Sequence, residues 1–98
     1  MKVVFISNFL THHQVPFCLE MQKRLGDDFK FISTVKIFYW RLKLGFKDLD
    51  NEYDFVVKAY KDAQTWKYAK KLANESDVVI IGSTTDDLIE ERLRQDKL

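Results

Sequence analysis

The sequence is poor in the residues that mark several common classes of protein. Cys18 is its one cysteine, so the 98 residues hold neither an internal disulfide nor a cysteine metal cluster. No apolar run approaches the ~20 residues that span a membrane. The start, MKVVFI, is too short for the core of a signal peptide and is typical of a strand at a natural N-terminus. With three glycines and one proline there is no linker or low-complexity segment. We therefore expect one domain, in the cytoplasm.

Several ligand sites are excluded as well. The formal net charge of +1 gives no generally basic surface, so no nucleic-acid partner is expected. The segment after the first apolar run has no glycine, which excludes the dinucleotide fingerprint, and there is no P-loop. Metal-binding receiver domains place an acidic pair after their first strand, where this chain has Ser7 and Asn8. Neither a metal nor a cofactor bound by this domain is expected.

Short apolar runs alternate with helical patterns along the chain. The runs have the length and continuity of strands covered on both faces and span residues 2–7, 29–34, 54–59 and 77–82. Helical patterns cover residues 13–25, 63–74 and 86–98, with a further short helix expected near 41–44. This alternation predicts an α/β fold: a three-layer Rossmann-like domain whose four-stranded parallel sheet, in order 3-2-1-4, is flanked by helices. The first and fourth runs would be neighbours at its centre.

For two of the expected helices, the sequence also predicts which face is buried and which is exposed to solvent. Val15, Cys18, Met21 and Leu25 recur at spacings of three and four and form one apolar stripe. Cys18 is then a packed core thiol. By contrast, EERLR at 90–94 is expected to be a solvated helix face without a site.

The clearest candidate site is SNFLTHHQVPF, residues 7–17. In open parallel sheets, ligands bind beyond the carboxyl ends of the strands, where the strand order reverses. Here that place lies between the first and fourth strands, and residues 8–14 and 82–85 reach it. His12 and His13 would sit at the start of a helix, where the positive dipole end favours neutral imidazole, able to accept a proton or donate a hydrogen bond. Alternatively, both rings satisfy loop carbonyls or face water.

Two other segments have more than one interpretation. GSTTDD, residues 82–87, offers N–H groups and hydroxyls to a phosphate or sugar, but is also an ordinary helix cap. KIFYWRLKLGFK, residues 36–47, interleaves basic and aromatic residues. It would suit peripheral contact with the inner face of a membrane, or a loop folded onto the sheet edge. The membrane anchors would be the aromatic residues Phe38, Tyr39, Trp40 and Phe46, with the basic residues Lys36, Arg41, Lys43 and Lys47.

The chain resembles the N-terminal half of group 1 glycosyltransferases of the GT-B architecture. The resemblance rests on KVVFISNFLTHHQVPFCLEMQKRLGDDFKFIST, RLKLGFKDLDNEYDFV and SDVVIIGSTTDDLIEERLRQDKL, which together cover most of the chain. It implies that residues 1–98 are an acceptor-side domain, facing a C-terminal domain, absent here, that binds a nucleotide-sugar donor. By analogy, Asn8, His12, His13 and Gln14 would face the cleft, with Ser83 and Thr84 on the acceptor side. Many relatives carry glycines after the first strand; this chain does not.

These observations lead to one expected function and two competing ones. We expect the acceptor-binding half of an enzyme that transfers a sugar to a saccharide or lipid-linked acceptor, inactive by itself. His13 or His12 is the candidate base if the enzyme inverts, and orients hydroxyls or the departing phosphate if it retains. The alternatives are a stand-alone α/β module that binds or regulates without catalysis, and a small flavin or nucleotide binder.

Overall fold

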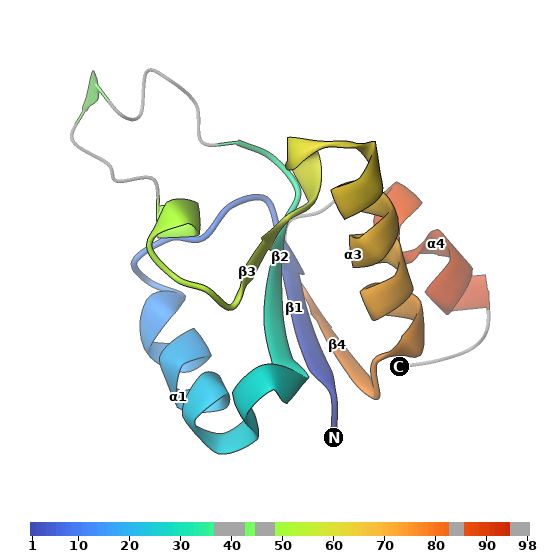
Figure 1. The fold of residues 1–98 in the computed structure, drawn as a ribbon, viewed down its shortest axis with the longest axis horizontal. Coiled ribbons are helices and arrows are strands. Elements are labelled where there is room, and N and C mark those ends of the chain that lie inside the picture. The colour runs from blue at the N-terminus through green and yellow to red at the C-terminus, as the bar shows by residue number, and fades with distance from the viewer. Residues whose placement is uncertain (37–42, 45–48, 83–85, 95–98) are drawn as a thin grey trace.

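The chain folds around one four-stranded, all-parallel sheet in the order β3-β2-β1-β4 (Figure 1). The structure, a computed structural model, describes residues 1–36, 43–44, 49–82 and 86–94. Its strands are β1 (Val3–Ser7), β2 (Phe29–Ser33), β3 (Val56–Lys58) and β4 (Val78–Ile81). Its helices are α1 (Val15–Leu25), α3 (Ala63–Glu75) and α4 (Asp86–Arg94), with short 3₁₀ turns η1 (Gly26–Asp28), η2 (Leu49–Asn51) and η3 (Ala59–Lys61). The predicted α/β class and strand order are confirmed.

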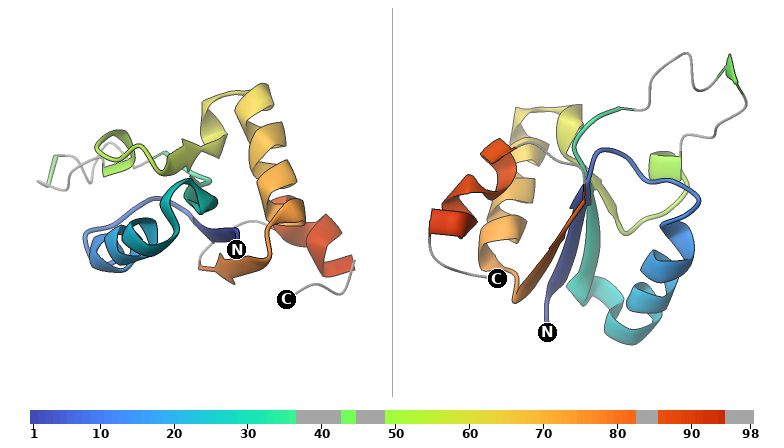
Figure 2. Two further views of the ribbon diagram at one scale, coloured as in Figure 1. Left: turned by 60° about the horizontal axis from the view of Figure 1, so that its bottom comes forward. Right: turned by 180° about the vertical axis from the view of Figure 1, so that it is seen from behind.

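Helices cover both faces of the sheet, as expected for a Rossmann-like domain. Figure 2 shows α1 on one face and α3, with α4 against it, on the other. The two faces have separate apolar cores, because alternate strand residues point to opposite sides. The α1 face is built around Val3, Leu10, Cys18, Phe29, Phe31 and Phe55, and the opposite face around Val4, Ile6, Ile32, Ala69, Ala73 and Leu88. None of the described helices has the length and hydropathy to cross a bilayer.

The fourth strand is not central. β1 pairs with β2 on one side and with β4 on the other, so β1 and β2 occupy the middle and β4 forms an edge of the described sheet. Val78 and Ile81 are accordingly 37% and 47% exposed, whereas Ile6 of β1 is fully buried. The prediction that the fourth apolar run lies at the centre is wrong. The prediction assumed that the most apolar strands lie in the middle of the sheet. Apolar composition does not fix the position of a strand, and β4 is an edge strand whose apolar side chains are partly exposed to solvent.

Helix α1 begins two residues later than predicted. Residues 12–14 form a turn in which the side-chain oxygen of Gln14 accepts a hydrogen bond from the backbone N–H of Thr11 at 2.9 Å. The helix starts at Val15 because Pro16 suits its first turn and offers no N–H for an earlier one. It ends at Leu25 and is capped by Gly26, whose φ of 58° is a conformation that favours glycine. The predicted stripe faces the sheet: Cys18 is buried, and burial raises its pKa to about 11.

The segment EERLR is a solvated face only in part, because Glu90, Leu93 and Arg94 are exposed as predicted whereas Arg92 is buried. Arg92 is only 3% exposed and donates hydrogen bonds to the backbone carbonyls of Ala73, Ser76 and Asp77, at 2.8, 2.6 and 3.2 Å. These carbonyls lie at the end of α3 and just beyond it, where helical hydrogen bonding stops. One guanidinium therefore satisfies three acceptors and joins α4 to the end of α3.

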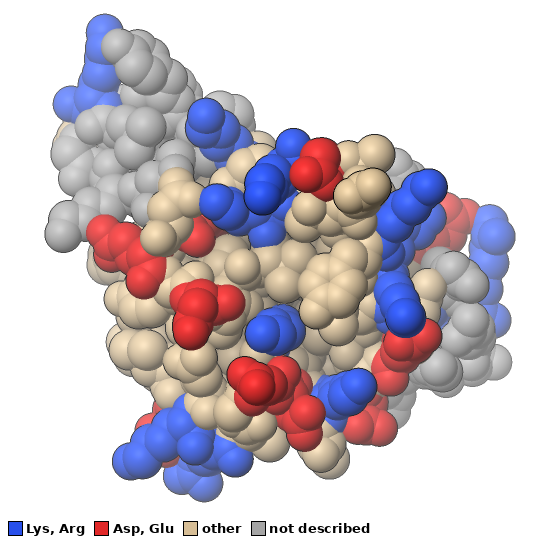
Figure 3. Space-filling model, in the orientation of Figure 1, with Lys and Arg blue, Asp and Glu red and all other residues tan. Residues whose placement is uncertain are grey.

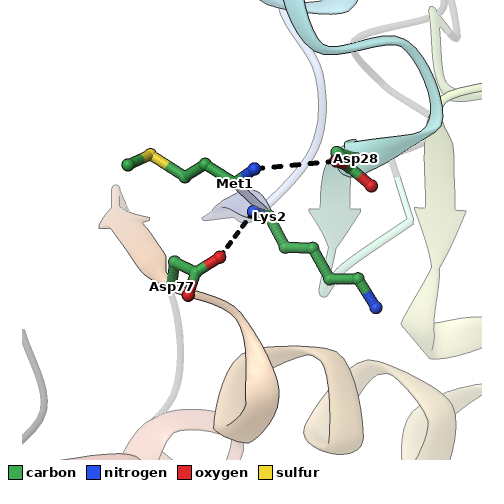
Figure 4. A network of polar contacts seen from close by, with 4 residues as sticks. All are labelled: Met1, Lys2, Asp28 and Asp77. Atoms are coloured by element: carbon green, nitrogen blue, oxygen red, sulfur yellow. Dashed lines mark hydrogen bonds and ion pairs between the residues drawn. The ribbon is translucent and has the colours of Figure 1, made fainter.

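At the amino end of the sheet, the two residues before β1 make polar contacts with the segments that precede its neighbouring strands. Figure 4 shows the N-terminal amine of Met1 facing the Asp28 carboxylate, 3.8 Å away, and the backbone N–H of Lys2 donating to Asp77 at 2.8 Å. Asp28 directly precedes β2 and Asp77 directly precedes β4. Both carboxylates thus hold the start of the chain against the beginnings of β2 and β4.

Candidate functional site

The loop that carries both histidines leaves β1 toward β2 rather than toward β4. The carbonyl of Asn8 accepts hydrogen bonds from the backbone N–H groups of Thr34 and Val35, at 2.9 and 2.8 Å, just after β2. Farther along, the N–H of Leu10 donates to the Asp50 carboxylate of η2 at 3.0 Å. In Figure 1 the loop runs from the top of β1 to α1, away from β4. The loop therefore lies at the carboxyl edge, but on the β2–β3 side of β1, so the prediction that it reaches the boundary between the first and fourth strands is wrong.

The two imidazoles are exposed and lie against one another. His12 and His13 occupy the turn before α1, with ring centroids 4.1 Å apart and ring planes inclined at 39°. Buried neighbours hold the loop on either side, since Phe9 and Leu10 are 4% and 2% exposed. The apolar residues thus anchor the loop, and the histidine rings are available to a ligand from solvent.

The other two loop residues proposed from the sequence are half-buried and already hydrogen-bonded within the loop. The side-chain oxygen of Asn8 accepts from the N–H of Phe9 at 2.8 Å and from the Ser7 hydroxyl at 3.3 Å. Gln14 holds the N–H of Thr11 in the same way. These amide oxygens shape the loop that presents His12 and His13.

The boundary between β1 and β4 is closely packed where it can be described. The N–H of Gly82 donates to the carbonyl of Ile6 at 2.7 Å. A Cβ added at Gly82 would lie 2.9 Å from the Ser7 hydroxyl oxygen, so a side chain there requires a shift of Ser7. Ser83 and Thr84, predicted to bind the acceptor, lie outside the described residues, as does Thr85 of the GSTTDD cradle. The histidine loop and Gly82 therefore lie on opposite sides of β1, the loop toward β2 and Gly82 at the end of β4.

A buried carboxylate, Asp50, also lies at this edge and was not among the residues predicted from the sequence. Asp50, in η2, is 3% exposed. One of its oxygens accepts from the N–H of Leu10, and the other accepts from the hydroxyls of Ser33 and Tyr60, at 2.6 and 3.1 Å. Ser33 ends β2 and Tyr60 belongs to η3, so this one side chain gathers the loop after β1, the end of β2 and the segment after β3.

A cationic pocket lies beside this carboxylate. It has a volume of about 380 Å³, and its described lining consists of Lys36, Asn51, Lys58, Tyr60 and Lys61. Tyr60 contributes to both features, because its hydroxyl bonds to Asp50 while the residue also lines the pocket. Within the pocket, the Lys58 ammonium donates to the side-chain oxygen of Asn51 at 2.6 Å.

The pocket lies at the carboxyl ends of the strands, which is the edge where parallel α/β sheets bind ligands. Lys36 comes three residues after β2, Lys58 ends β3 and Lys61 ends η3, and the carboxyl ends of parallel strands share one edge. Register confirms it, because Ser33 pairs with Lys58 across β2 and β3. The same reasoning applied to the second and third strands could have found the three lysines. Asp50 carried no such signal, since nothing in its spacing marked it as buried.

The segment considered for membrane contact can be described only in part. Lys36, Lys43 and Leu44 are exposed, whereas residues 37–42 and 45–47, with all four aromatic anchors, lie outside the described residues. In the part of the chain that the structure describes, no group of three His, Cys, Asp or Glu side chains is placed to hold a metal ion.

Comparison with known proteins adds no relative. No family model matches the chain, and the searches of curated proteins and of solved structures also found no match. The function must therefore be argued from the residues at the carboxyl edge.

Proposed function

We propose that this chain is the acceptor-binding half of a nucleotide-sugar-dependent glycosyltransferase of the GT-B architecture. One observation carries the proposal: in a parallel sheet of order β3-β2-β1-β4, the loop after β1 presents the exposed rings of His12 and His13 at the carboxyl edge. This is the edge at which open α/β sheets bind ligands. The exposed apolar edge strand β4 adds support, because a longer chain would cover Val78 and Ile81.

The reaction gives the two imidazoles a defined task. An acceptor hydroxyl oxygen forms a bond to the anomeric carbon of the donor sugar, and the bond from that carbon to the donor phosphate oxygen breaks. The nucleoside diphosphate departs with the electron pair. In an inverting enzyme, His13 or His12 takes the hydroxyl proton, which as general-base catalysis contributes about 10²–10⁴-fold in rate. In a retaining enzyme the same rings orient acceptor hydroxyls or the departing phosphate through hydrogen bonds.

The proposal is tested with the 98-residue chain and with the product of the whole reading frame. Saccharides titrated into the ¹⁵N-labelled chain should shift the amide resonances of residues 8–14, and the chain alone should transfer no sugar. The whole product should transfer sugar from one member of a panel of nucleotide sugars. Replacing both histidines with alanine should abolish that activity, whereas Lys23→Ala, at the exposed far end of α1, should leave it unchanged. Transfer by the 98 residues alone would contradict the proposal.

A stand-alone α/β binding module is the second candidate. It is favoured by the pocket of Lys36, Lys58 and Lys61, whose described lining comes from this one sheet edge. The reading frame beyond codon 98 discriminates the two functions. A second α/β pattern of roughly 200 residues, the size of a further domain or two, supports the transferase. A stop codon supports the module.

Peripheral membrane contact through residues 36–47 is a separate proposal. It is supported by the interleaved basic and aromatic residues of that segment and by the exposure of Lys36 and Lys43. Co-sedimentation with liposomes, with and without anionic lipid, tests it. Binding to neither liposome removes the proposal, without bearing on the histidine loop.

A further inference from the structure

The pocket at the ends of β2 and β3 concentrates positive charge in a chain of nearly neutral composition. Three of its five described lining residues are lysines, and no carboxylate is among the five, although the formal net charge of the chain is +1. Figure 3 shows basic side chains gathered at the top of this face, where η3 connects β3 to α3. Lysine side chains that line one pocket repel one another, so the arrangement favours a bound anion.

Among the described residues, no ion pair joins Lys36, Lys58 or Lys61 to a carboxylate, although the Asp62 carboxylate interacts electrostatically with Lys61. The ion pairs found among the described side chains and the chain terminus lie elsewhere, at Asp28, at Arg24 with Glu20 and at Arg94 with Glu90. Asp50, below Tyr60, is buried and accepts hydrogen bonds from one backbone N–H and two hydroxyls.

The other carboxylate close to the pocket belongs to Asp62, next to Lys61, and it too has a structural task. As the N-cap of α3, it accepts from both the N–H and the hydroxyl of Thr65 at 2.7 Å. The hydrogen bond from the Thr65 backbone lowers the pKa of the Asp62 carboxyl and keeps it ionised in that role. Among the described side chains, the partner found for the Lys58 ammonium is the neutral amide oxygen of Asn51.

Three of the described lining residues, Asn51, Lys58 and Tyr60, are held in place by hydrogen bonds within the protein. Lys58 is fixed at the end of a paired strand, and Asn51 holds its ammonium at 2.6 Å. Tyr60 is tied to Asp50, which is tied in turn to the loop after β1 and to the end of β2. A site whose groups are already in place loses less entropy on binding.

We propose that this pocket binds the phosphate group of a small phosphomonoester. Lysine ammoniums recognise phosphate as point charges, whereas planar carboxylates are matched better by arginine, which is absent from the described lining. A phosphomonoester carries close to two negative charges at neutral pH, which suits a pocket whose described lining includes three lysines. The volume of about 380 Å³ accommodates a small molecule. The inference stands on the pocket alone and does not depend on the proposed transferase.

The test is a titration of the ¹⁵N-labelled 98-residue chain, at constant ionic strength, with glycerol 3-phosphate and with inorganic phosphate. Glycerol serves as the uncharged control. Saturable shifts are expected for the amides of residues 36, 51 and 58–61, and glycerol should leave them unchanged. Vesicles of phosphatidylcholine with and without phosphatidic acid distinguish a lipid headgroup from a free phosphate ester. Binding to the phosphatidic acid vesicles alone assigns the site to a lipid phosphate, provided that it requires the pocket lysines.

Matched variants distinguish binding by the pocket lysines from a general effect of the positive charge of the protein. Lys58→Gln should weaken binding about tenfold, as expected for losing a hydrogen bond to a charged group. The combined change of Lys36, Lys58 and Lys61 to glutamine should abolish it. The control changes the exposed residues Lys23, Lys67 and Lys71 to glutamine, which removes the same charge elsewhere and should leave binding within about twofold.

Three results would overturn the proposal. They are the absence of saturable binding to every phosphate probe, shifts confined to other parts of the sheet, and equal losses in the pocket triple and the control triple. Unfolding curves of both triples confirm that any loss comes from folded protein. None of these outcomes bears on saccharide binding at residues 8–14, so failure here and failure of the proposed transferase can be told apart.

Discussion

The backbone N–H of Leu10 donates a hydrogen bond to the carboxylate of Asp50, forty residues farther along the chain, at 3.0 Å. Both residues are buried. Through this contact the loop that carries the histidines and the turn that borders the lysine pocket depend on one another. The two candidate sites therefore share a structural support, although they face different ligands.

Removing the Asp50 carboxylate should destabilise the fold strongly. Asp50→Ala leaves the Leu10 N–H and the hydroxyls of Ser33 and Tyr60 without this acceptor, and we expect a loss of about 2–4 kcal/mol in the free energy of unfolding. Urea denaturation followed by circular dichroism measures it. Glu52→Ala, an exposed carboxylate two residues away, should change the stability by less than about 0.5 kcal/mol. Equal effects of the two changes would contradict a structural role for Asp50.

Arg92 should matter far more than its neighbour Arg94. Arg92→Ala removes the donors to three carbonyls around the end of α3 and should cost about 2–4 kcal/mol of unfolding free energy. Arg92→Lys should recover only part of the loss, because one ammonium cannot reproduce the planar set of donors. Arg94→Ala, which breaks an exposed pair with Glu90, should cost less than about 0.5 kcal/mol. Chemical denaturation of the three variants decides the order.

The Cys18 thiol should be inert in the folded protein. Because burial raises its pKa to about 11, little thiolate exists at pH 8, and the side chain is inaccessible. Ellman's reagent should react slowly in buffer and rapidly in denaturing urea. Fast labelling of the native chain would show that α1 does not pack as described.

The raised pKa of the Cys18 thiol also predicts how the stability of the fold depends on pH. Between the ordinary value of 9.0 and about 11, the unfolded chain releases the Cys18 proton while the folded chain retains it. Stability contributed by the neutral thiol is therefore complete below pH 9 and declines as the pH rises toward 11. Cys18→Ala should lose that part of the decline, which urea denaturation at pH 8, 9 and 10 can measure.

Replacing the two histidines should leave the fold intact. His12 and His13 are exposed, so changing both to alanine should alter the free energy of unfolding by less than about 0.5 kcal/mol. Leu10→Ala, a buried position in the same loop, should cost about 2–4 kcal/mol. Thermal and urea unfolding compare the two. A large loss from the histidine change would mean that the rings support the loop, and would weaken their proposed role toward an acceptor.

The sequence by itself determined the class of the fold and its strand order. Short apolar runs alternating with helical stripes admit few arrangements, because crossovers between parallel strands are right-handed and helices must bury one face. The stripe of Val15, Cys18 and Met21 illustrates this, since a local period of 3.6 residues was enough to place Cys18 in the core. The position of His12 and His13 at the carboxyl edge followed from the same topology.

Only the tertiary structure decided which charged residues are buried and which ones converge. Asp50 and Arg92 are charged residues of the kind that usually lie on the surface, yet both are buried. Each is hydrogen-bonded to groups that are distant in the sequence: Asp50 accepts from one N–H and two hydroxyls, and Arg92 donates to three carbonyls. Lys36, Lys58 and Lys61 line one pocket because β2 and β3 end at the same edge of the sheet. Periodicity is a property of neighbours along the chain, whereas the energy of a buried charge depends on groups that folding brings from far away.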